Sequence, residues 1–190
     1  MVSLDFAEVE ALQSSGDWQN AASMLIDAAL RLQATGVDAV MVCTNTMHKV
    51  AEELEAAIDI PLLHIADATA AALVRNDIVR VALLGTAFTM EEDFYVGRLV
   101  RRGLNVITPI EAQRQFVHEV IYQELCIGEI REESRRAYLS IIDDLAEKGA
   151  QAVILGCTEI SLLVSQQHTD IELYDTTAIH ARAAVDFMLS

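Results

Sequence analysis

The chain has 190 residues, 53% of them hydrophobic, and a formal net charge of −16. A chain of this length buries about 70% of the surface that its unfolded form exposes, so a substantial core is expected. The strong negative charge excludes a basic nucleic-acid footprint and disfavours an anionic membrane surface, and no run approaches the roughly 18 apolar residues of a membrane helix.

The first half of the chain is predicted to alternate short strands with helices. Residues 2–6 form a short apolar run typical of a strand, and helical sequence interrupted near Gly16 follows up to Gly36. From Gly36 the chain runs through mostly apolar residues to Cys43, a pattern that predicts a buried parallel strand ending at polar residues. Residues 60–69 predict another short strand that leads into an alanine-rich helix.

The second half follows the same order of elements. Residues 79–85 predict a strand that ends in a glycine turn and a helix start. Residues 134–148 predict an amphipathic helix, because their large apolar residues lie on one stripe. That stripe consists of Tyr138, Ile141, Ile142 and Leu145. The remaining predicted elements are a short apolar strand at 106–110, a buried strand at 149–156, and a strand at 171–177 that leads into a helix at 180–189.

This shared order makes the two halves a repeat, and each unit of a repeat predicts its partner. The strand at 79–85 has no counterpart in the first half. We therefore expect that the chain has lost a strand–helix unit before Met1, or that the sequence as given begins late. A strand missing from inside a parallel sheet would leave unpaired backbone groups, so such a chain is expected to be unstable alone or to fill the gap with a second copy.

The expected fold is α/β, with two pseudo-symmetric parallel-sheet lobes of which the first lacks its first strand and helix. Residues 1–77 and 178–190 are expected to form lobe 1, and residues 78–177 lobe 2. The chain has only two prolines and no low-complexity stretch, so no disordered linker is expected between the lobes.

Small polar side chains follow both repeated strands. Thr44 and Cys157 each lie eight residues after the glycine that opens their strand, and Asn-Thr and Thr-Glu follow them. In α/β folds, ligands bind beyond the carboxyl ends of parallel strands. Two such ends from two similar halves predict one cleft that is approached from both sides, which is the geometry of a two-sided proton transfer.

Cys157 is the leading candidate for a catalytic group. It lies between a strand and a helix start, and a helix N-terminus lowers a thiol pKa from about 8.5 towards neutrality. A base whose pKa lies near the operating pH suits general acid–base catalysis. The alternative is a small buried hydrophobe, because free cysteine is often buried, but the repeated placement favours a functional role.

Thr44, rather than Cys43, is expected to face Cys157 across the cleft. Successive side chains of a strand point to opposite faces, and the count from the two glycines pairs Thr44 with Cys157. A bulge at the strand end would reverse this assignment. Cys126 lies in helical sequence and is expected in the core. The three cysteines have no metal-type spacing, which predicts free thiols in a reducing, cytoplasmic compartment.

No metal or cofactor is expected. The five histidines share no metal-ligand spacing. His64 is expected to be structural, and His48 to touch the site or cap the turn. Pyridoxal phosphate needs a lysine, and neither Lys49 nor Lys148 follows a strand. The turn at 85–89 lacks the glycine pattern of a nucleotide-binding loop.

Two segments resemble the signature motifs of the aspartate/glutamate racemase family: Cys-Thr-Asn-Thr-Met-His at 43–48 and Gly-Cys-Thr-Glu-Ile at 156–160. The similarity extends over essentially the whole chain, including 63–67, 81–86 and 89–91. It implies two α/β lobes around a cleft, no cofactor, and a homodimer, with one proton-transferring residue from each lobe.

The resemblance also implies roles for individual residues. Thr44 stands where the usual pattern has a cysteine, as in the L-aspartate/glutamate-specific branch with its threonine–cysteine pair, so Thr44 and Cys157 are the implied catalytic residues. A thiol near neutrality is a far better base than a hydroxyl, and the resemblance assigns the cysteine face to the L-amino acid. The implied substrate contacts, to the ammonium, the α-carboxylate and the side chain, are Gln13, Asn45, Thr46, Thr86, Thr89, Thr158 and Glu159.

The predicted function is therefore cofactor-independent racemisation of an acidic amino acid, aspartate or glutamate. A second possibility is another cofactor-free carbon-acid enzyme, such as a hydantoin racemase or a decarboxylase. A third is a non-catalytic chain that at most binds a small carboxylate, which the absent first unit would favour.

Overall fold

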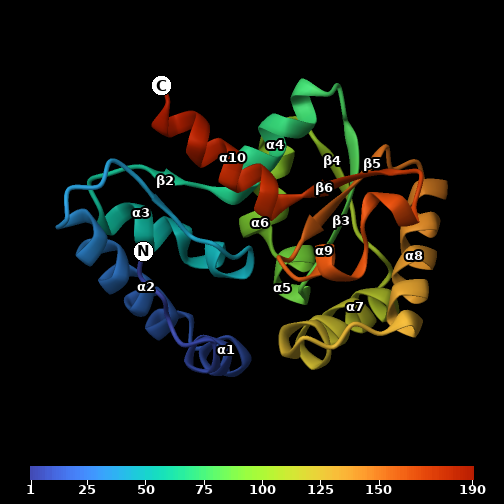
Figure 1. Cartoon of the computed structure of the whole chain (residues 1–190), viewed down its shortest axis with the longest axis horizontal. Coiled ribbons are helices and arrows are strands. Elements are labelled where there is room, and N and C mark those ends of the chain that lie inside the picture. Colours follow the sequence, from blue (N-terminus) through green and yellow to red (C-terminus); the bar gives the residue numbers. More distant parts are fainter.

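The computed structural model describes residues 1–190 and contains two parallel β-sheets surrounded by helices (Figure 1). The smaller sheet pairs β1 (Val40–Met41) with β2 (Leu62–Leu63). The larger sheet has the strand order β4-β3-β5-β6, with β3 (Arg80–Gly85) and β5 (Ala152–Gly156) in its centre. The predicted α/β fold with parallel sheets is thus confirmed.

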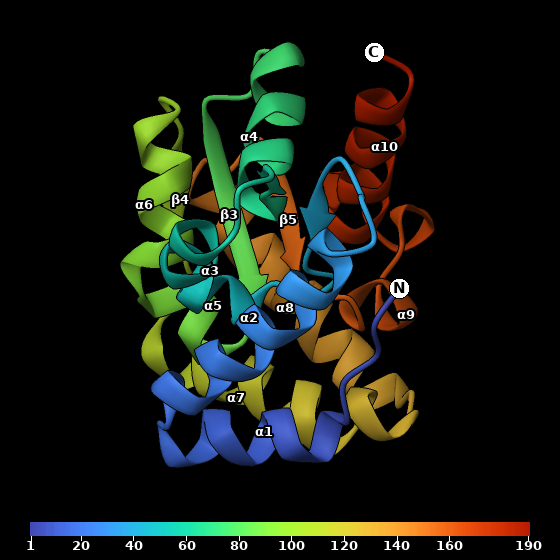
Figure 2. The same cartoon turned by 90° about the vertical axis from the view of Figure 1, so that its left-hand side faces the viewer.

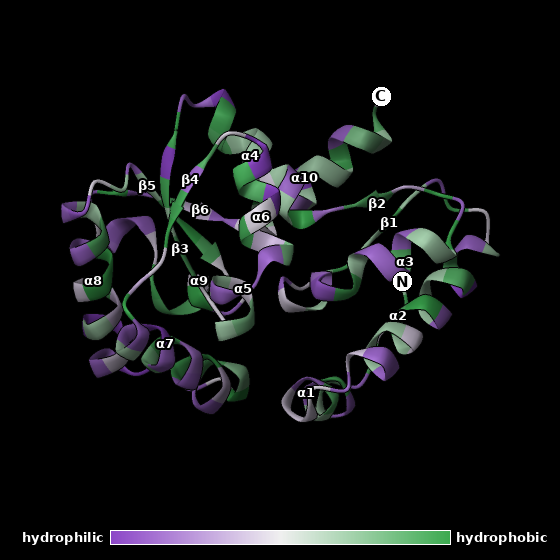
Figure 3. Ribbon diagram, turned by 180° about the vertical axis from the view of Figure 1, so that it is seen from behind, coloured by the Kyte–Doolittle hydropathy of each residue, from purple (hydrophilic) through white to green (hydrophobic).

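The larger sheet carries the main hydrophobic core. Every residue of β5 is buried, and β4 (Asn105–Ile107) and β6 (Glu172–Asp175) form the two edges. Two long helices, α7 (Glu111–Gln123) and α8 (Glu132–Glu147), pack against β3. The buried face of α8 includes the stripe predicted from the sequence: Tyr138, Ile141, Ile142 and Leu145. Figure 3 shows apolar, green strands in this sheet beside helices that also carry purple, polar residues.

The smaller sheet lies beside the N-terminal helices and has only small clusters of buried residues around it. The larger of these two clusters includes Val9, Met47 and Val50, and the other includes Val40 and Leu54. The elements of this part are α1 (Phe6–Ser15), α2 (Trp18–Gln33), the 3-10 helix η1 (Thr46–Val50) and α3 (Ala51–Ala57).

The helix α10 (Thr176–Met188) connects the two parts of the fold. It follows the larger sheet, yet it packs along α4 (Ile65–Arg75), as Figure 2 shows. Its His180 Nε2–H donates a hydrogen bond of 2.7 Å to the carbonyl oxygen of Leu63 in β2. The remaining short elements are α5 (Ala87–Glu91), α6 (Asp93–Arg101), η2 (Leu125–Ile127), α9 (Ile160–Leu163) and η3 (Gln166–His168).

None of the helices combines the length and the apolar character that a bilayer span requires.

Residues 2–6 do not form the predicted strand. Asp5 instead caps α1, because its carboxylate accepts a hydrogen bond of 2.9 Å from the backbone N–H of Ala7, and Leu4 packs against the cluster around Val9. A short apolar run becomes a strand only where a neighbouring strand pairs with its backbone groups, and no strand pairs with this segment. For the same reason β1 is shorter than predicted: its partner, β2, has only two residues.

The two central strands of the larger sheet both end in a glycine. Gly85 and Gly156 are partners in the parallel register. A Cβ on Gly156 would lie 2.8 Å from the Leu84 carbonyl oxygen and 2.9 Å from Leu83 Cδ1, and one on Gly85 would lie 2.9 Å from the Gly156 carbonyl oxygen. These strand ends therefore require residues without side chains.

We predict that Gly156→Ala lowers the free energy of unfolding by about 1–3 kcal/mol, because the added methyl group collides with backbone that cannot move freely. Denaturant unfolding followed by circular dichroism measures the loss. Gly97→Ala is the matched control, since the three atoms nearest to its Cβ all belong to the side chain of Asp93, which is exposed and can turn away. Equal loss of stability in both variants would contradict the prediction.

Candidate active site

Three neighbouring strands of the larger sheet end in polar side chains at one edge. Thr86 follows Gly85 at the end of β3, and Cys157 follows Gly156 at the end of β5. The register of β5 and β6 pairs Leu155 with Asp175, so Thr176 lies beside Gly156 at the end of β5. Because the strands are parallel, all three side chains belong to the carboxyl edge, where α/β folds bind ligands.

The segment after β1 reaches across to this edge. Asn45 Nδ2–H donates a hydrogen bond of 3.0 Å to Thr176 Oγ1, and the hydroxyl groups of Thr46 and Thr86 are 3.0 Å apart. The hydroxyl of Thr86 is also 3.1 Å from that of Thr89 in α5. All five side chains are buried. The structure thus brings four of the predicted substrate-binding residues together: Asn45, Thr46, Thr86 and Thr89.

A buried histidine holds the segment that contains Thr44. His48 Nδ1–H donates to the Thr44 carbonyl oxygen at 2.7 Å, and its Nε2 accepts from the Ile65 N–H at 3.3 Å. Burial lowers the pKa of His48 to about 3, so the ring is neutral and one tautomer serves both contacts. His64 has the structural role expected of it: its Nδ1 accepts from the Ala66 N–H at 3.1 Å and caps α4.

Cys157 has an environment opposite to the one predicted. Its Sγ–H donates a hydrogen bond of 2.9 Å to Glu159 Oε2. Burial, together with the negative charge of Glu159, raises the pKa of the Cys157 thiol well above its usual value. The predicted lowering depended on a helix N-terminus, but the helix that follows, α9, has only four residues and therefore a small dipole. In the free protein the thiol is protonated at neutral pH.

Glu159 also influences other groups around Cys157. Cys126 is half-buried, and burial together with the charge of Glu159 raises the pKa of its thiol to about 11. The hydroxyl of Thr158 makes no hydrogen bond within the chain, whereas its carbonyl oxygen accepts one of 3.2 Å from Ser161 Oγ. Thr158 and Glu159 are both partly buried in the turn after β5.

Gln13 lies in a bridge between α1 and α7. Its Nε2–H donates to Met47 Sδ at 3.1 Å, and its Oε1 accepts from the Tyr122 hydroxyl at 2.9 Å. Burial raises the pKa of Tyr122, and the negative charge of Glu159 adds to this effect. Gln13, the residue predicted to recognise the substrate side chain, is therefore buried, and both the nitrogen and the oxygen of its amide are hydrogen-bonded.

Neither Thr44 nor Cys43 makes a side-chain hydrogen bond. Thr44 is partly buried, whereas Cys43 is exposed to solvent. No hydrogen bond joins Thr44 to Cys157.

Sequence reasoning missed Thr176 and Tyr122 as members of this region. A signal for Thr176 was present, because Asp-Thr-Thr at 175–177 ends a predicted strand just before a predicted helix. Tyr122 belongs to an ordinary amphipathic helix, and nothing in its sequence neighbourhood distinguishes it.

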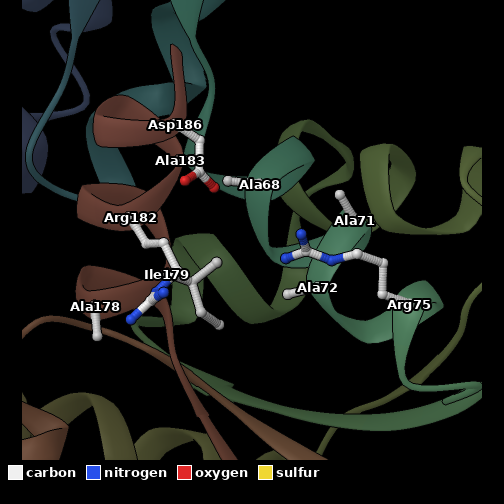
Figure 4. A pocket seen from close by; sticks show the side chains of 9 residues that line it. All are labelled: Ala68, Ala71, Ala72, Arg75, Ala178, Ile179, Arg182, Ala183 and Asp186. Atoms are coloured by element: carbon white, nitrogen blue, oxygen red, sulfur yellow. The ribbon is translucent and has the colours of Figure 1, made fainter. Parts of the chain in front are cut away.

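Two surface cavities lie apart from Cys157 and the strand ends. One of about 320 Å³ lies between α4 and α10, where alanines on both helices leave a groove flanked by Arg75, Arg182 and Asp186 (Figure 4). Another of about 400 Å³ lies between α1 and α7 and is lined by Glu10, His118 and Tyr122 among others. No predicted site residue lines either cavity.

Comparisons with known proteins give one consistent result. The family model described as Asp/Glu/hydantoin racemase matches residues 3–184. The chain is 25% identical to the broad specificity amino-acid racemase RacX of Bacillus subtilis over 166 residues, which cover 87% of this chain and 71% of RacX.

Solved structures agree. A putative Asp/Glu racemase from Yersinia pestis is 52% identical, with a TM-score of 0.91 and coverage of 99% of this chain and 82% of that one. An aspartate racemase homologue from Pyrococcus horikoshii is 30% identical, with a TM-score of 0.84 and coverage of 100% and 82%.

We predict that Glu159→Gln lowers the pKa of the Cys157 thiol, because the substitution removes the negative charge that disfavours the thiolate. At any pH below the wild-type pKa, the variant then holds more thiolate. The rate of alkylation of Cys157 by iodoacetamide, followed by peptide mass spectrometry, should rise at a lower pH in the variant. Glu147→Gln, at an exposed position on α8, is the control and should leave this pH profile unchanged. A Glu159→Gln profile that overlays the wild type would mean that burial alone sets the thiol pKa.

Proposed function

The chain belongs to the Asp/Glu/hydantoin racemase family, and on that premise we propose that it interconverts the enantiomers of an acidic amino acid, aspartate or glutamate, by two-sided proton transfer without a cofactor. The two groups that exchange the α-proton are Cys157 and Thr44. The observation that carries the proposal is the junction of the two repeated motifs: Asn45 and Thr46 bond to the polar ends of the strands on either side of Cys157.

The proposed chemistry needs one acid–base group on each face of the α-carbon. The Cys157 thiolate takes the α-proton of the L-enantiomer, and the Thr44 hydroxyl gives a proton to the opposite face. Before the next turnover, Cys157 releases the proton that it took to solvent and Thr44 regains one from solvent. The reverse reaction asks a threonine oxygen to act as the base, and a hydroxyl is a far weaker base than a thiolate near neutrality. Proton abstraction from the L-enantiomer is therefore faster than from the D-enantiomer.

The bound substrate provides the means to form the thiolate. In the free protein Cys157 is protonated, and its proton is already directed at Glu159 Oε2. An ammonium group placed near the sulfur favours the charged thiolate, since an opposite charge within about 4–6 Å stabilises the ionised form of an acid. The substrate thus helps to generate its own base, and Glu159 is the nearest acceptor for the thiol proton.

The carboxylates of the substrate need local donors. The net charge of −16 opposes the approach of a dianionic ligand at long range. Short-range donors compensate for this repulsion, and the hydroxyl groups of Thr46, Thr86 and Thr89 form a connected group at the strand ends that can donate to a carboxylate. The unbonded hydroxyl of Thr158 is a further donor beside Cys157.

We predict that Cys157→Ala reduces α-proton exchange by about 10²–10⁴-fold, the usual contribution of a positioned acid–base group. Exchange of L-aspartate and L-glutamate in deuterated water, followed by NMR with no cofactor added, measures this loss. Cys126→Ala is the matched thiol control and should keep most of the activity. Unchanged exchange in Cys157→Ala would remove this residue from the mechanism, and no exchange with either amino acid in the wild-type chain would contradict the proposed function.

A second pair of variants tests which residue faces the substrate from the other side. Thr44→Cys creates a pair of thiols and should raise the turnover of the D-enantiomer, because a thiolate replaces the weaker base. Cys43 is exposed, so Cys43→Ala should leave the rate within about twofold of wild type. Initial rates with each enantiomer, measured by polarimetry, decide the matter. If Cys43→Ala loses activity and Thr44→Ala keeps it, Cys43 is the acid–base group that faces Cys157.

A further inference from the structure

The hydroxyl group of Thr176 already donates its only proton to a hydrogen bond. Thr176 is the first residue of α10 and is fully buried. Its Oγ1–H donates a hydrogen bond of 2.8 Å to the carbonyl oxygen of Leu155 in β5. A hydroxyl has one proton and two acceptor sites. Towards any other neighbour, Thr176 can therefore act only as an acceptor.

This constraint determines the orientation of the Asn45 amide. Asn45 is the neighbour that meets Thr176 Oγ1, and it does so through Nδ2–H at 3.0 Å. If the amide were turned over, Oδ1 would face an oxygen that has no proton left to donate. Thr176 thus selects one of the two amide orientations, although the two residues are 131 positions apart in the chain.

The selected orientation leaves the other end of the amide without a partner. Asn45 is 2% exposed, and its Oδ1 is buried and accepts no hydrogen bond. The hydroxyl groups of the neighbouring Thr46 and Thr86 are, by contrast, bonded to each other. A buried acceptor that lacks a donor costs about 1–3 kcal/mol, so a ligand N–H group that reaches Oδ1 would gain both a hydrogen bond and relief from that cost.

We infer that Thr176 is a positioning residue that holds the carbonyl oxygen of Asn45 ready for the ammonium group of the substrate, and so makes the site prefer an α-amino diacid over the same diacid without its amine. The inference rests on the proposed function for the identity of the ligand. A carboxylate could not take this place, because an amide oxygen has no proton to offer it. Whether Asn45 presents its amide oxygen or its amide nitrogen to a ligand is thus determined by a residue of the other part of the fold, at the start of α10.

Substitutions at 176 separate this role from simple packing. Thr176→Val has nearly the same shape but no hydroxyl, so it frees the Asn45 amide to turn. Thr176→Ser keeps the hydroxyl and should keep the amide orientation. Thr177→Val changes an adjacent, exposed threonine and is the control. Thr176→Ala also lacks the hydroxyl and replaces the valine variant if that one does not fold.

The first measurement concerns the free protein and needs no activity. The Nδ2 protons of Asn45, observed by ¹⁵N NMR, should be protected from solvent exchange in the wild type and in Thr176→Ser. They should lose that protection in Thr176→Val or Thr176→Ala. Protection that survives removal of the hydroxyl would overturn the inference, whatever the protein does with amino acids.

The second measurement compares ligands with and without the amine by calorimetry: L-aspartate against succinate, and L-glutamate against glutarate. The wild type, Thr176→Ser and Thr177→Val should prefer the amino acid by about tenfold or more, the ratio expected for one hydrogen bond to a charged donor. Thr176→Val should lose this preference while it binds the amine-free diacid as before.

The outcomes distinguish this inference from the proposed function. A packing defect would weaken both ligands equally in Thr176→Val, and that result would overturn the inference, as would a wild type that binds both ligands alike. Protection and amine preference that behave as expected, in a chain that exchanges no α-proton, would support the role of Thr176 and contradict the racemase activity.

Discussion

The parallel pairing of β3, β5 and β6 is the constraint on which the candidate site depends. It brings the ends of three strands to one edge, so that Thr86, Cys157 and Thr176 become neighbours although they are distant in the chain. The glycine pair at 85 and 156 permits this, since a side chain at either position would collide with the adjacent backbone. The local chemistry is therefore a consequence of strand register, and any change that separates the strand ends also takes the site apart.

Electrostatics determines the protonation state of Cys157 in the free protein. A partly buried thiol that lies next to a carboxylate and is followed by a helix of one turn keeps its proton. A protein with a net charge of −16 offers little long-range attraction to an acidic ligand. In the proposed function, the ammonium group of the amino acid favours the thiolate and provides the donor that the buried oxygen of Asn45 lacks.

Contacts between the two parts of the fold hold this arrangement together. Asn45 and Thr46 bond to residues of the larger sheet, His180 bonds back to β2, and Tyr122 bonds to Gln13. Two of these four contacts are buried and the other two are partly buried. Buried polar groups of this kind are costly when they are left unpaired, so the two sheets are coupled by hydrogen bonds as well as by apolar packing.

The sequence alone was sufficient for the class of fold and the apolar stripe of α8, because these follow from local periodicity. The resemblance of the two motifs implied that Asn45, Thr46, Thr86 and Thr89 belong to one site, and the structure brings these residues together at the strand ends. Tertiary structure decided the rest. Residues 2–6 have strand-like composition but no strand beside them, so Asp5 opens a helix instead. The pKa of Cys157 depends on burial and on the position of Glu159, and neither can be judged from a motif followed by a helix start. Thr176 gains its role only through a contact with Asn45, and such long-range contacts depend on how the two sheets pack, because hydrogen bonds form between groups that are close in space whatever their distance in the chain.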